Sequence, residues 1–169
     1  MKAILSALAL MLFVSPAFAD VTIELKSVEV NAMKSNGKTW DVKIPLMKKS
    51  ELPDLMVEVK NGDDTILKTI VNKNALSDSF DGASCIDLKK KMKDRIKEKI
   101  KGKKPAGVAC KVIVANAHAK DVSITVWDAD KTGNDEMGKF SIVGKDGDVS
   151  FNGNGVKGLA VTISGNKAE

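Results

Sequence analysis

Short runs of alternating apolar and polar residues are the feature that most constrains how this chain can fold. Residues 21–26 alternate with a period of two, as side chains do when a strand buries one of its faces. Gly and Asn residues separate further short runs that are apolar or rich in β-branched side chains: 55–59, 65–71, 111–115, 122–127, 139–143, 149–151 and 159–164. Together the runs predict an all-β, antiparallel, eight-stranded β-sandwich, with a barrel as the alternative.

One segment departs from this pattern and predicts an inserted basic α-helix over about residues 84–104. Within it Leu88, Met92, Ile96 and Ile100 recur every four residues, which is the spacing of one narrow apolar stripe on a helix. Residues 85–104 contain ten Lys or Arg against three acidic residues, so the positive charge of the chain is concentrated here. Two interpretations of the basic face of this helix remain open. The face is either solvated, with the apolar stripe packed beneath it, or it contacts an anionic surface.

The first 19 residues have the layout of a secretory signal peptide. Lys2 precedes an apolar run from Ile4 to Val14, and Ala17-Phe18-Ala19 is a small-x-small cleavage site. The run is too short to span a bilayer. We therefore expect residues 20–169 to form one domain of a bacterial exported protein, either periplasmic or secreted.

The cysteine and histidine content limits the chemistry of such a protein. Export favours a disulfide between Cys85 and Cys110, worth about 3 kcal/mol in the chain-entropy model; two separate thiols are the alternative. One His and two Cys exclude a multi-ligand His/Cys metal site. An enzyme centred on His118 is one alternative function, but no nucleophile motif accompanies this residue, so we do not expect the protein to be an enzyme. Nucleic acid is not expected as a partner, because the helix lacks aromatic residues for stacking.

An acidic loop at residues 127–138 is the strongest chemical signal. Asp128, Asp130 and Asp135 fall within eight residues, beside Asn134 and Glu136. Crowded carboxylates repel one another unless a cation lies between them, and Ca²⁺ prefers oxygen ligands. The alternative is a turn whose acids are simply solvated. An EF-hand is excluded, because its twelfth position would be Lys139 rather than Glu.

Asp41 and Asp54 form a second acidic pair, on either side of the segment that precedes the strand at 55–59. A sandwich gathers the loops at one end of its sheets, so loops distant in sequence can share one site. The pair can therefore join the 128–135 loop if both loops lie at the same end.

These segments together resemble a C2 domain, the calcium- and lipid-binding β-sandwich. Residues 35–41 and 52–59 are similar to the first calcium loop of that family and its following strand, although Pro53-Asp54 reverses the usual Asp-Pro order. Residues 69–76 are similar to the next strand and its turn. Residues 122–130 and 134–138 are similar to the third loop, with Asp-x-Asp followed by Asp-x-x-Gly.

The resemblance implies five ligands for one or two Ca²⁺ ions: Asp41, Asp54, Asp128, Asp130 and Asp135. It also implies calcium-triggered docking to anionic phospholipid or another anionic surface. We expect the protein to be a monomer.

Residues 44–49 suit such docking. Ile44, Leu46 and Met47 could insert among headgroups while Lys48 and Lys49 meet anionic lipid; alternatively the apolar residues pack on the sandwich. The alternative function is an exported protein-interaction module with a structural calcium and no lipid binding. Trp40 and Trp127 are expected to anchor the core or its loops, with a position at the membrane interface as the alternative for Trp40.

Overall fold

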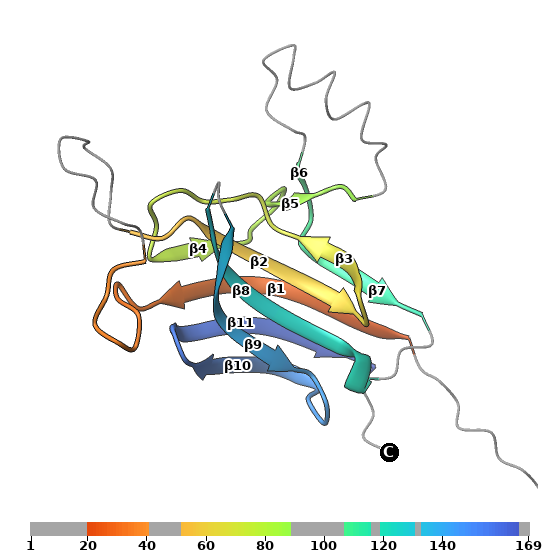
Figure 1. Cartoon of the computed structure of the whole chain (residues 1–169). Helices are drawn as coiled ribbons and strands as arrows, with labels where there is room; N and C mark the ends of the chain where they lie inside the picture. The colour runs from red at the N-terminus through yellow and green to blue at the C-terminus, as the bar shows by residue number, and fades with distance from the viewer. Residues whose placement is uncertain (1–19, 41–51, 89–106, 116–118, 131–132, 166–169) are drawn as a thin grey trace, which may run out of the picture.

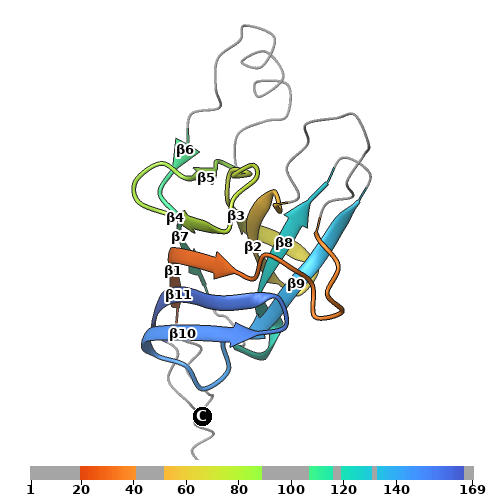
Figure 2. The ribbon, with the colours of Figure 1, turned by 90° about the vertical axis from the view of Figure 1, so that its left-hand side faces the viewer.

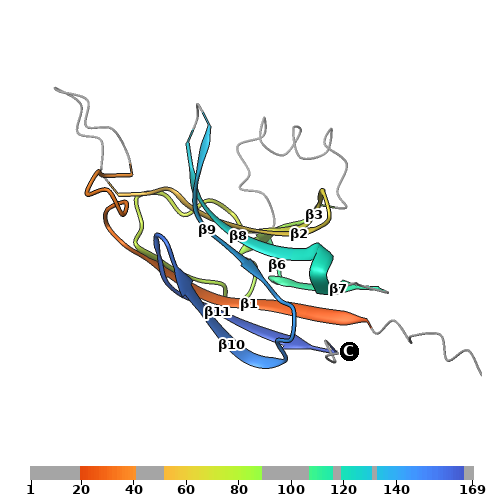
Figure 3. The same cartoon turned by 60° about the horizontal axis from the view of Figure 1, so that its bottom comes forward.

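Two antiparallel sheets face each other in the computed structural model of the chain, which describes residues 20–40, 52–88, 107–115, 119–130 and 133–165 (Figures 1 and 3). This arrangement confirms the prediction of an all-β antiparallel sandwich. No helix in these described ranges is long and apolar enough to cross a membrane. The predicted signal peptide lies outside them.

The first sheet is built around strand β1. Its strands lie in the order β10 (Gly147–Gly153), β11 (Val156–Ser164), β1 (Val21–Val30) and β4 (Ser77–Ser79). Strand β7 (Lys111–Val114) pairs with the first half of β1, on the same side as β4. The second half of β1 therefore leads out of the sheet beside β4, towards the segment 31–40.

The second sheet carries the acidic loop. Its strands lie in the order β3 (Asp64–Lys68), β2 (Leu55–Asn61), β8 (Val122–Ala129) and β9 (Asn134–Ser141). A short 3₁₀ helix, η1 (Ala119–Asp121), leads into β8. Figure 2 shows β2, β8 and β9 in one layer and β1, β10 and β11 in the other.

Period-two burial explains why these runs fold as strands. In β1 the residues Val21, Ile23 and Leu25 are almost fully buried, and the residues between them are less so. In β8 the inward row is Val122, Ile124, Val126 and finally Asp128, each at most 1% exposed. The alternation that builds the core thus also carries an aspartate into the interior, at the end of its row.

The disulfide between Cys85 and Cys110 is present, as the sequence predicts, with its Cα atoms 5.1 Å apart. Both cysteines are buried in the hydrophobic core, and Cys85 begins strand β5 (Cys85–Ile86), which pairs with β6 (Gly107–Val108). The amide of Leu25 in β1 donates to the carbonyl of Cys110 at 2.9 Å. The bridge therefore ties the chain on both sides of residues 89–106 to the sandwich.

The structure departs from the sequence prediction in the limits of its elements. Cys85 and Ile86 form a strand, although the predicted helical segment includes them; residues 89–106 lie outside the described part. The described residues form eleven strands rather than eight, because the short β4, β5 and β6 add to the predicted runs. Strand β9 also begins at Asn134, five residues earlier than the sequence predicts, so it takes in half of the acidic loop.

Candidate metal centre

The acidic site is built on the hairpin of β8 and β9. Asp128 in β8 is paired directly with Asp135 in β9, so the two side chains leave the sheet on the same face. Asp130 lies two residues after Asp128. Like charges directly opposite each other destabilise a pair of strands. The register therefore creates an electrostatic repulsion that a bound cation would offset.

The carboxylates of Asp128, Asp130 and Asp135 form what we call the acidic cluster. One oxygen from each lies within 4.8 Å of the others. Asp128 is fully buried, Asp130 is half-buried and Asp135 is exposed. The cluster therefore runs from the interior of the sandwich to its surface, which gives an ion a path to the buried carboxylate.

Asp128 is held in place by the start of β2. Its Oδ1 accepts a hydrogen bond of 2.8 Å from the amide of Asp54, and the amide of Ala129 donates to the carbonyl of Asp54 at 2.8 Å. Its second oxygen, Oδ2, is also buried. Buried carboxylates are normally hydrogen-bonded, paired with cations or bound to metals. The Asp54 backbone thus orients the innermost member of the acidic cluster.

The side chain of Asp54 points elsewhere. Its Oδ1 accepts a hydrogen bond of 2.9 Å from the amide of Asn74, whose φ of 53° places it in the left-handed region. The carboxylate thereby supports the turn that follows β3, and it is not one of the three that converge. Asp54 remains a predicted ligand, and binding an ion through its carboxylate would require this contact to change.

The remaining predicted site residues lie outside the described ranges. Asp41 and the segment containing Ile44, Leu46, Met47, Lys48 and Lys49 belong to residues 41–51, and His118 belongs to residues 116–118. The chain that leads to Asp41 is described, however. Its last described residue, Trp40, is 6% exposed and belongs to the hydrophobic core, which confirms its predicted role as an anchor.

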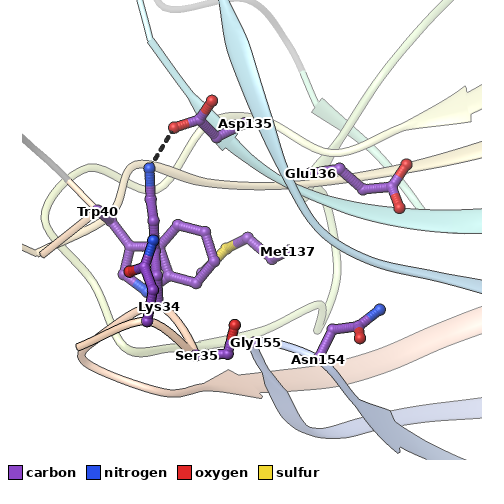
Figure 4. Close-up of a pocket in the computed structure, with 9 residues that line it drawn as sticks. Lys34, Ser35, Trp40, Asp135, Glu136, Met137, Asn154 and Gly155 are labelled. Atoms are coloured by element: carbon purple, nitrogen blue, oxygen red, sulfur yellow. Dashed lines mark hydrogen bonds and ion pairs between the residues drawn. The ribbon is translucent and has the colours of Figure 1, made fainter. Parts of the chain in front are cut away.

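A lysine reaches the acidic cluster from this neighbouring segment. The Nζ of Lys34 lies 2.6 Å from Oδ2 of Asp135, and the same ammonium group lies 5.3 Å from the centre of the Trp40 ring (Figure 4). The three groups line a cavity of about 330 Å³ together with Met137, Asn154 and Gly155. Sequence reasoning missed Lys34, because 101 residues separate it from Asp135 and no motif links them.

The donor set of the acidic cluster suits a hard divalent cation. All three side chains offer carboxylate oxygens, and neither His nor Cys joins them within the described ranges. Oxygen ligands of this kind suit Ca²⁺, which accepts irregular geometry and additional backbone or water oxygens. The residues present therefore fit the ion that the sequence predicts, with Asp128, Asp130 and Asp135 as the residues that would hold it.

No protein-family model matches the chain, and no curated protein matches it. Among solved structures the chain is similar to one described as a C2 domain, at 14% identity over 86% of this chain and 98% of the other, with a TM-score of 0.46. It is also similar to a C2 domain of a plant extended synaptotagmin 1, at 13% identity over 86% and 92% of the two chains, with a TM-score of 0.44. A structure of extended synaptotagmin 2 that contains SMP and C2 domains matches at 14% identity over 86% of this chain and 26% of its own, with a TM-score of 0.49.

Proposed function

We propose that this protein is an exported, non-catalytic calcium-binding module that attaches to anionic phospholipid when Ca²⁺ is bound. The observation that carries the proposal is the convergence of three carboxylates within 4.8 Å, one of them fully buried and directly opposite another in the sheet. In this proposal the ion offsets their mutual repulsion and presents a positive charge to a phosphate group.

The surroundings of the acidic cluster support a membrane as the partner. Met33 is 55% exposed in the turn that also carries Lys34, so a large apolar side chain faces solvent next to the site. Such a residue can enter a headgroup layer while bound ions and nearby lysines meet lipid phosphates. The segment 44–49 lies outside the described residues; it follows this turn in the sequence, and its apolar and basic residues suit the same kind of docking.

Isothermal titration calorimetry with Ca²⁺ tests the site. We expect the wild-type protein to bind and the variant Asp128→Asn/Asp130→Asn to lose binding, because two of the three carboxylates of the acidic cluster have been neutralised. The variant Asp63→Asn/Asp64→Asn is the matched control, since it removes two exposed acids from the β2–β3 turn at the opposite end of the sheet. Wild-type protein that gives no binding isotherm would rule out the site.

Co-sedimentation with vesicles tests the attachment. Vesicles containing phosphatidylserine should pull down the wild-type protein with Ca²⁺ and release it with chelator, whereas purely zwitterionic vesicles should retain less. Calcium binding and thermal stabilisation without sedimentation would instead support the second role, a protein-interaction module with a structural calcium.

A further inference from the structure

The segment between β1 and residue 41 holds Lys34 in a defined position beside the acidic cluster. The amide of Lys34 donates to the carbonyl of Lys38 at 2.8 Å, and the amide of Gly37 donates back to the carbonyl of Lys34 at 2.9 Å. Met33 and Thr39 are bridged across the same turn. These bonds fix the backbone from which the lysine side chain extends.

Trp40 anchors this turn to the body of the sandwich. Its Nε1 donates to the carbonyl of Asn31 at 2.8 Å, and its ring lies so close to Gly155 that a Cβ there would come within 2.6 Å of it. The amide of Asn31 in turn donates to the carbonyl of Gly155 at 2.8 Å. The side chain of Lys34 therefore extends from a turn that is packed against the sandwich, and it lies over the indole ring of Trp40. Figure 4 shows the side chain reaching Asp135.

We infer that Lys34 is a built-in competitor for the cation, which neutralises Asp135 in the ion-free protein and must leave it when a divalent ion binds. This inference rests on the proposed calcium site. The ammonium group supplies one positive charge to a cluster of three carboxylates, at the member that lies nearest the solvent. Lys34 therefore raises the calcium concentration at which the site fills.

The strength of the contact suits a competitor rather than a permanent bond. The Lys34 side chain is 28% exposed and that of Asp135 is 51% exposed, so water replaces the pair at small cost. Exposed ion pairs of this kind shift an equilibrium by about two- to fivefold. Such a factor adjusts the affinity of the site without closing it to calcium.

Two lysine-to-methionine variants separate direct competition from a general effect of charge. Lys34→Met keeps an unbranched side chain that can lie on Trp40 but removes the ammonium group. Lys38→Met removes the same charge from the same turn, at a residue with no ion pair to the acidic cluster among the described residues. We expect Lys34→Met to bind Ca²⁺ about two- to fivefold more tightly than wild type, and Lys38→Met to remain within about 1.5-fold of wild type.

Thermal unfolding supplies a readout that does not depend on measuring affinity. With chelator, Lys34→Met should melt below Lys38→Met by up to about 4 °C, because Asp135 has lost its counter-charge. With saturating Ca²⁺ the two variants should melt together, since the ion has displaced the lysine in any case.

Each outcome of the calcium titrations either supports or overturns the role of Lys34 as a competitor. Equal calcium affinities for the two variants would overturn the competitor and leave the calcium site intact. A wild-type protein that binds no Ca²⁺ would overturn both the competitor and the proposed function. Tighter binding by Lys34→Met alone, with convergence of the melting temperatures in calcium, supports the inference.

Discussion

Burial changes the chemistry of single residues in this sandwich, and Asp78 in β4 is an example outside the metal centre. Burial raises the pKa of its carboxyl group above the usual value, and hydrogen bonds from Ser79 and Asn72 offset this only in part. The folded state therefore binds the carboxyl proton of Asp78 more tightly than the unfolded chain does. Ionised Asp78 lowers the free energy of unfolding at pH values above its folded-state pKa, and this penalty fades as the pH falls through that pKa.

We accordingly expect Asp78→Asn to be more stable than wild type at neutral pH and equally stable near about pH 3, where both side chains are neutral. Asparagine keeps the oxygen that accepts the Ser79 amide, so the variant changes mainly the charge. Denaturant unfolding across this pH range measures the difference. A stability difference that does not change with pH would contradict the explanation.

The individual residues of the metal centre could be predicted from the sequence to different degrees. Asp128, Asp130 and Asp135 converge as predicted, because period-two alternation and hairpin pairing place them on one face of the sheet. The role of Asp54 is only partly visible in the sequence, since its backbone orients Asp128 while its side chain supports the turn at Asn74. Lys34 gave no signal, because its contact depends on how two distant turns pack.

At the scale of the elements, strands with clear alternation were predictable and strands defined by their neighbours were not. β1 buries every second residue from Val21 to Leu25, and β8 buries the alternating row from Val122 to Asp128, as the alternation in the sequence indicates. β9 begins with Asn134, Asp135 and Glu136, which are poor strand formers. It extends this far because these three residues pair with the last three residues of β8. The two-residue strands β5 and β6 pair with each other, and Cys85 of β5 also bridges to Thr69, so both strands depend on contacts distant in sequence.

The disulfide yields a prediction at the same scale. The variant Cys85→Ala/Cys110→Ala should lose about 3 kcal/mol of unfolding free energy, because the unfolded chain gains freedom and β5 loses its crosslink to Cys110, whose carbonyl accepts a hydrogen bond from Leu25 in β1. Denaturant titration measures the loss. Wild-type protein unfolded in the presence of a reductant should have the same free energy of unfolding as the variant. A variant as stable as the oxidised protein would show that hydrogen bonds alone hold β5 in place.

At the scale of the whole molecule, the two sheets share one core, and the metal centre lies at one end of it. Buried residues from both sheets form a single hydrophobic cluster, which includes Trp40 beside the site and both cysteines. Asp128 occupies the last position of the inward row of β8. The packing that stabilises the fold therefore also positions the acidic cluster. A substitution should change the stability of the fold without changing calcium binding only if it lies in the core far from the metal centre.

Leu159 provides such a substitution. It is fully buried in β11, in the sheet opposite the acidic cluster, where it contributes to the shared core. Leu159→Ala should lower the free energy of unfolding by about 2–5 kcal/mol, because it leaves a cavity that the neighbouring strands cannot close. Since both sheets depend on this core, far-UV circular dichroism and tryptophan fluorescence should report the same shifted midpoint.

Calcium affinity should meanwhile stay at the wild-type value, because none of the three carboxylates contacts β11 in the strand pairing of the sheets. Titration calorimetry at a temperature where the variant is fully folded measures this. Two separate unfolding midpoints would show that the sheets unfold independently. A large loss of calcium affinity would show that packing in the first sheet holds the β8–β9 hairpin in its binding geometry.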